Sequence, residues 1–198
     1  MLFRSQAAGN VNLDVFGFVQ LEGSFAIKKA DGDVTLAGGE EVAVNRMIIG
    51  GTVTSAFAGL NGGSDDALGM ELSGVEFGLA LMTGKDDPAR SWTSLQGSVD
   101  SASFVGVDGL TVAVTSLGIS INQAGLGTDR VIDYGTDATD LTIATGPSSD
   151  LTLTMEGSKG RLLQVAGDFE LDVFGFLQVE GSFAIEDRKS TRLNSSHT

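Results

Sequence analysis

The feature that most restricts the fold of this chain is a segment of 19 residues that occurs twice. Residues 9–27 read GNVNLDVFGFVQLEGSFAI and residues 167–185 read GDFELDVFGFLQVEGSFAI, so 14 of 19 positions are identical at an offset of 158 residues. Such self-similarity is typical of tandem-repeat proteins, in which each unit buries its apolar surface against its neighbours. We therefore interpret residues 6–163 as one full repeat unit and residues 164–186 as the start of the next.

The two ends of the chain depart from this pattern. Residues 187–198 read DRKSTRLNSSHT, an abrupt change from apolar alternation to Arg, Lys, Ser and Asn. This segment and residues 1–5 (MLFRS) both resemble translated sequencing adapters, and we expect both to be non-native scars. The native sequence would then continue in both directions.

Apolar residues alternate with polar ones through most of the chain, which is the period of a β-strand with one buried face. Residues 11–27 follow this period throughout, and Gly17 and Gly23 indicate bends or bulges within one long strand. Residues 39–46 could form one helical turn. Further strands are predicted at residues 42–49, 75–81, 110–122, 141–144 and 151–156, with turns at residues 31–33, 61–63, 84–88, 125–129 and 146–147.

These patterns predict an all-β fold, an elongated antiparallel sheet or roll built from long tandem repeats. A parallel β-helix or solenoid is the alternative. Alternation favours the antiparallel sheet, because strands of parallel sheets are buried on both faces and read as unbroken apolar runs. We expect residues 167–185 to pair beside residues 151–156, because residues 156–159 give a short turn and consecutive strands are usually neighbours.

Catalytic chemistry has little support in the sequence. The chain has no cysteine, and its one histidine is His197, in the segment interpreted as a scar. Thiol nucleophiles, Ser-His-Asp triads and His-based zinc sites are therefore excluded for the native segment. Asp65 with Asp66, and Asp86 with Asp87, are adjacent carboxylates in predicted loops, which lack the opposed geometry of a glycosidase pair. We predict no catalytic residue and no enzymatic activity.

Calcium is the one metal that the sequence suggests, because it takes oxygen ligands from Asp residues in tight loops. The candidates are Asp31, Asp33, Asp65 and Asp66, but neither pair completes an EF-hand or a nonapeptide calcium repeat, and a plain turn is the favoured interpretation. No other cofactor is predicted. The candidates considered and set aside are Gly118, Gly125 and Gly127, which form no nucleotide-binding motif, and Trp92, which is more typical of a core than of a sugar platform.

The net charge of −14, from 26 acidic and 12 basic residues, disfavours nucleic acids and anionic membranes as partners. No apolar run reaches the roughly 18–20 residues that span a bilayer as a helix, so we expect no membrane insertion by this segment.

The motif LDVFGF followed by EGSFAI, together with SAFAGLNGG and SGVEFGLALM, resembles the long tandem repeats of very large bacterial surface or secreted proteins of the adhesin-like kind. The resemblance covers residues 6–186. It implies an extracellular or cell-surface location, neighbouring repeats of the same chain as partners, and a glycan or protein ligand bound elsewhere in the full chain. The function it implies is a structural or spacer repeat that supports adhesion or surface display. The alternatives are a calcium- or glycan-binding β module and, less favoured, a fragment of a carbohydrate-active enzyme.

Overall fold

The computed structural model describes residues 5–135 and 138–189, and these residues form ten strands and one short 3₁₀ turn. The all-β prediction is confirmed. The elements are β1 (Ser5–Val15), β2 (Val19–Thr35), β3 (Glu41–Leu60), β4 (Leu68–Gly84), β5 (Ser91–Val105), β6 (Leu110–Ala124), β7 (Thr142–Ala144), β8 (Asp150–Thr152), η1 (Gly157–Lys159), β9 (Arg161–Val173) and β10 (Leu177–Lys189).

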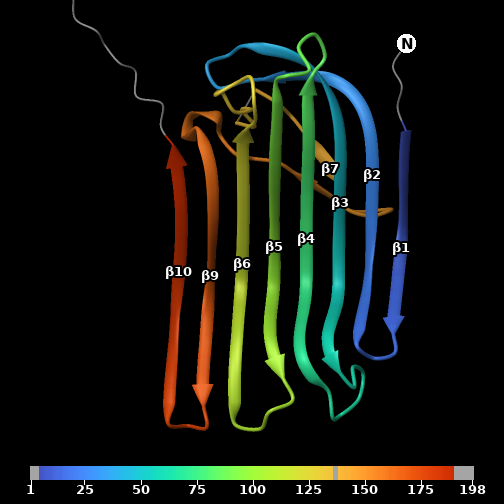
Figure 1. Cartoon of the computed structure of the whole chain (residues 1–198), viewed down its shortest axis with the longest axis vertical. Helices are drawn as coiled ribbons and strands as arrows, with labels where there is room; N and C mark the ends of the chain where they lie inside the picture. Colours follow the sequence, from blue (N-terminus) through green and yellow to red (C-terminus); the bar gives the residue numbers. More distant parts are fainter. Residues whose placement is uncertain (1–4, 136–137, 190–198) are drawn as a thin grey trace, which may run out of the picture.

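Eight of the strands form one antiparallel sheet in the order β1-β2-β3-β4-β5-β6-β9-β10 (Figure 1). Strands β7 and β8 form a separate two-stranded ribbon. The strands of the large sheet are long, up to 20 residues in β3. All pairings among the described strands are antiparallel. The elongated antiparallel sheet is therefore the observed architecture, and the parallel β-helix is not.

The segment predicted as one strand over residues 11–27 is instead a hairpin. Val15 pairs with Val19, so Phe16 to Phe18 form a three-residue connection, in which Phe16 and Gly17 have positive φ angles of 52° and 71°. The Asp14 carboxylate stabilises this turn by accepting hydrogen bonds from the Gly17 backbone N–H at 2.9 Å and from the Gln20 side-chain amide at 3.1 Å. The chain therefore reverses at Phe16, where the sequence suggested a bend.

The second copy of the segment forms the same hairpin between β9 and β10. Phe174 and Gly175 have φ angles of 53° and 71°, and Asp172 accepts hydrogen bonds from the Gly175 N–H and the Gln178 amide, both at 2.8 Å. The two similar sequences thus form equivalent turns, six strands apart in the sheet.

The expected pairing of the second copy beside residues 151–156 is wrong. Strand β9 pairs with β6, from Leu110 opposite Val173 to Asn122 opposite Leu162. The reason is that residues 125–135 and 138–160 leave the sheet and cross one of its faces, and we call them the covering segment. Leu153 and Met155 point from this segment into the core, so they are not available as an edge for β9.

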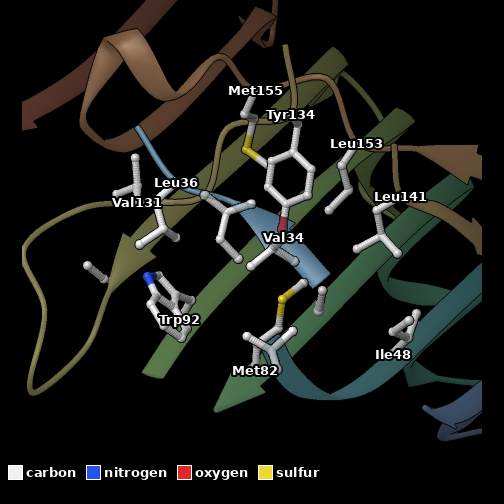
Figure 2. Packing of buried hydrophobic residues seen from close by; sticks show 14 of the residues in the cluster. Val34, Leu36, Ile48, Met82, Trp92, Val131, Tyr134, Leu141, Leu153 and Met155 are labelled. Atoms are coloured by element: carbon white, nitrogen blue, oxygen red, sulfur yellow. The ribbon is translucent and has the colours of Figure 1, made fainter. Parts of the chain in front are cut away.

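The core lies between the covering segment and one end of the sheet. Leu36, Ile132, Ile143 and Leu153 are at most 1% exposed, and side chains of the covering segment pack against Val34, Val44, Ile48 and Met82 of the sheet (Figure 2). Trp92 is also in this core, where its indole N–H donates to the Arg130 carbonyl at 2.8 Å. The interpretation of Trp92 as a core residue is confirmed.

Two local predictions near the start of β3 are wrong. Residues 31–33 are not a turn but part of β2, where Asp31 to Asp33 pair with Asn45 to Ala43. Residues 39–46 are not helical, because Gly38 and Gly39 have positive φ angles and make the turn from which β3 starts at Glu41. Long-range pairing therefore outweighs the turn propensity of the Asp-Gly-Asp sequence.

Candidate interaction surfaces

The sheet has one apolar face with no cover from any described segment, and we call it the open face. Its residues follow from the pairing register, because directly paired residues lie on the same face. One row across the sheet consists of Ala7, Ile27, Ile49, Leu79, Leu95, Ile121, Leu163 and, at the outer edge, Asp187. A second row consists of Val15, Val19, Ala58, Met70, Phe104, Val112, Leu171 and Val179.

The opposite face, called the covered face, has a different composition. Beneath the covering segment, the covered face presents Ile48 and Ala80, which are at most 4% exposed. These residues are the sequence neighbours of Ile49 and Leu79 on the open face. Beyond the covering segment it becomes polar. A row there consists of Asn12, Glu22, Ser55, Ser73, Ser101, Thr115, Asp168 and Ser182.

A line of irregularities across the sheet keeps each face continuous. The register shifts between Glu22 and Gly23 against β3, and between Thr115 and Gly118 against β9. Gly74 and Ser116 have positive φ angles of 60° and 52° on this line. Strands β3 to β6 thus gain one residue each at the same level, as in β-bulges, and the apolar side chains stay on the open face on both sides of it.

Exposure confirms that the open face is in contact with solvent. Ile27, Met47, Met70 and Val112 are all at least 40% exposed on four different strands. A hollow of about 720 Å³ at one end of this face is lined by Met47, Leu81 and Thr93, among others. In the described parts of the chain, β7 and β8 approach only the covered face, where Ile143 lies over Gly50 and Gly78.

The open face has a relief of large and small residues. Phe25, Gly51, Phe77 and Gly97 are consecutive in one row, and the two rings are 6.4 Å apart with an angle of 58° between their planes. A Cβ atom on Gly51 would lie 2.7 Å from the Phe25 ring and 2.8 Å from the Phe77 ring. A side chain at position 51 would therefore force at least one of the two rings to move.

The outer strands β1 and β10 each leave one edge without a partner among the described residues. These edges are equivalent to paired ones. The free edge of β1 corresponds to the edge of β9 that binds β6, and the free edge of β10 corresponds to the edge of β2 that binds β3. Ser5 and residues 187–189 belong to these outer strands, whereas the rest of the two segments interpreted as scars, residues 1–4 and 190–198, lies outside the described residues.

The structure places the four calcium candidates at opposite ends of the sheet. Asp31 lies in β2 and forms an ion pair of 3.1 Å with Lys85, and Asp33 is exposed nearby. Asp65 and Asp66 lie in the β3–β4 loop, about 50 Å away at ~3.3 Å per residue along β3. In the described parts of the chain, no three His, Cys, Asp or Glu side chains are grouped as metal ligands.

Local turn contacts are present at both pairs of adjacent acidic residues. The Asp87 side chain accepts a hydrogen bond from the Ala89 N–H at 3.1 Å, within its own loop. The Asp66 backbone N–H donates to Ser64 Oγ at 3.3 Å, which is likewise a turn contact.

The carboxylates of Asp14 and Asp172, in the two hairpin turns, have lowered pKa values. The pKa of Asp14 is lowered by the Gly17 N–H and then by the Gln20 amide. The pKa of Asp172 is lowered by the Gln178 amide and then by the Gly175 N–H. Both effects stabilise the turn in its ionised form, because hydrogen bonds to a carboxylate favour its charged state.

Sequence reasoning missed the open face as a candidate surface. Its signal is present in the period-two pattern, in which Val19, Leu21, Phe25 and Ile27 lie on one side of β2. The pattern identifies an apolar side but not whether the folded chain covers it.

No family model, no curated protein and no solved structure matches this chain. None of the described residues forms a helix long and apolar enough to cross a membrane.

Proposed function

We propose that this chain is a structural module, a repeat unit that extends a continuous β-sheet and serves as a spacer in a long bacterial surface protein. The observation that carries the proposal is the pairing of β9 with β6. Strand β9 contains the start of the second copy of the repeated segment, yet it is hydrogen-bonded to the first unit over nearly its whole length.

The free edges support the same proposal. If a preceding unit were present, its equivalent of β6 would lie beside β1, whose sequence is similar to that of β9. A following unit would place its equivalent of β3 (Glu41–Leu60) beside β10, as β3 lies beside β2. Each unit would then add six strands, or about 29 Å at ~4.8 Å per strand.

The chemistry of the described residues fits a module without a catalytic site. The Asp87 carboxylate accepts a hydrogen bond within its own loop, and Trp92 is buried in the core. A location outside the cell and a role in adhesion or display are part of the proposal, and both rest on the resemblance of the repeated motif to adhesin-like repeats.

A chain in which residues 6–163 occur twice before residues 164–186 tests the proposal. We expect small-angle scattering to fit one rigid particle that is about 29 Å wider across the strands than the parent, and denaturant unfolding to show one cooperative transition. Two units that move independently, or unfold in separate transitions with the parent's midpoint, would reject it.

A matched pair of proline variants in the two-unit chain tests the junction itself. In this chain, Val11→Pro in the second copy lies in the strand that joins the two units, whereas Val11→Pro in the first copy lies in the outermost strand. Proline removes a backbone donor and is tolerated mainly at sheet edges, so the substitution in the second copy should uncouple the units while the substitution in the first copy should not. Equal effects of the two variants would contradict a continuous sheet.

A further inference from the structure

We propose that the open face of the sheet binds the open face of a second copy of this chain, so that two sheets form a sandwich. This inference is independent of the edge-to-edge continuation above, because it concerns a face and not an edge. Its basis is the run of apolar rows from the row of Ile49 to the row of Met70, where most side chains are half-buried or exposed in the single chain.

The size of this surface matches that of a stable interface. Eight strands at ~4.8 Å give a width of about 38 Å, and the apolar rows extend for about 30 Å along β3 at ~3.3 Å per residue. The face therefore covers on the order of 1,000 Å², above the ~300–600 Å² of the largest apolar patch on a typical monomer. Two such faces together would bury about 2,000 Å², the upper end of the standard range for specific interfaces.

The charge distribution favours a second copy as the occupant. The two rows that contain Ile49 and Met70 hold one charged residue, Asp187, and it lies at the outer edge. Two open faces can therefore meet without burying unpaired charge. The acidic residues that give the chain its net charge of −14 include Glu22 and Asp168 on the opposite face, where they would remain in water.

The relief of the face also suits packing against a second sheet. Facing sheets lie ~10 Å apart with interdigitated side chains, so they need projections and hollows. Phe25 and Phe77 project on either side of Gly51, and Gly97 is the next residue in the row. A fluid lipid surface has no fixed projections and hollows to match this pattern. An anionic lipid surface would also repel the acidic chain.

Analytical ultracentrifugation of the 198-residue chain tests the proposal. We expect a dimer at micromolar concentration. Ile27 and Val112 are 46% and 40% exposed in the single chain, so I27E with V112E should leave the fold intact and weaken dimerisation at least ~100-fold, because both charges would be buried in the sandwich. The control S98E with T115E adds the same charge on the covered face and should remain dimeric. Circular dichroism and unfolding midpoints verify that both variants are folded.

Crosslinking gives a second, independent readout, because the chain has no cysteine. Ala102 lies on the open face and Ser101 on the opposite one, so A102C should form disulfide-linked dimers on mild oxidation and S101C should not.

A monomeric parent, or a dimer that survives I27E with V112E, would overturn the proposal. Binding of a monomeric parent to phosphatidylcholine vesicles would also overturn it, in favour of a lipid surface. Open-ended oligomers unaffected by the face variants would indicate pairing of the edges of β1 and β10, which overturns the sandwich and leaves the proposed function standing.

Discussion

The Tyr134 hydroxyl donates a hydrogen bond to Ser94 Oγ over 2.8 Å, and this contact joins the covering segment to the sheet. Ser94 Oγ in turn donates to Asn122 Oδ1 at 3.3 Å, and the Asn122 amide donates to the Ile132 carbonyl at 2.7 Å. Ser94 and Asn122 are fully buried. The polar groups of these residues thus satisfy one another across the interface that closes the core, which fixes where the covering segment lies.

Substitutions of Tyr134 and of Ser94 should reduce the free energy of unfolding by different amounts. Tyr134→Phe leaves Ser94 bonded to Asn122 and should reduce the free energy of unfolding by about 1 kcal/mol. Ser94→Ala leaves the Tyr134 hydroxyl and Asn122 Oδ1 without their partner in the core, and should reduce it by about 2–3 kcal/mol. Urea unfolding of the three proteins gives both values. A smaller loss for Ser94→Ala than for Tyr134→Phe would show that the chain of hydrogen bonds does not hold the interface.

Tyr134 should also make the protein sensitive to high pH. Burial is the main cause that raises the pKa of Tyr134 above its ordinary value of 10.0. The folded state therefore keeps a proton that the unfolded state releases, so the contribution of Tyr134 to stability is constant below about pH 10 and is lost as the pH rises above it. Tyr134 is the only tyrosine in the chain, so absorbance reports its titration directly. Ionisation near pH 10 with the protein still folded would contradict the burial of this hydroxyl.

Gly50 should tolerate no side chain, because it lies directly beneath the covering segment. A Cβ atom there would be 2.1 Å from the Ala144 carbonyl oxygen, which is backbone and cannot rotate away. We expect Gly50→Ala to reduce the free energy of unfolding by about 3 kcal/mol, the upper end of the cost of overpacking. Gly9→Ala is the matched control, since nothing lies within 4 Å of its Cβ position. Similar midpoints for the two variants in thermal unfolding would mean that β7 does not press on the sheet.

The sequence predicted the class of the fold well because period-two alternation is a local property. It failed at the Phe16 turn, because a phenylalanine with positive φ is unusual and the stabilising contact of Asp14 with Gly17 is visible only once the chain has reversed. The strand Ser91–Val105 was not predicted at all, since its many serines hide the alternation that its position in the sheet requires.

The candidate surface was less predictable for a different reason. Ile48 and Ile49 are adjacent and equally apolar, yet Ile48 is buried under the covering segment and Ile49 faces outward. Which of the two is covered depends on where the covering segment crosses the sheet. That crossing is determined by long-range contacts such as Leu36 with Ile132, which no pattern along the chain encodes.

The two hairpin turns should weaken together in acid. Hydrogen bonds lower the pKa of both Asp14 and Asp172, so the unfolded state takes up protons before the folded state does. Their contribution to stability is complete above the unfolded pKa of about 3.9 and is lost as the pH falls through the lower folded value. Asp14→Asn with Asp172→Asn should therefore reduce stability at pH 7 and flatten its decline below pH 4. Glu22→Gln with Glu180→Gln is the matched control, because these carboxylates occupy equivalent strand positions in the same two hairpins and neither lies in a turn. Unfolding midpoints between pH 2 and pH 7 give the comparison. If the stability of the Glu variant declined in acid as little as that of the Asp variant, the acid response would come from overall charge and not from the turns.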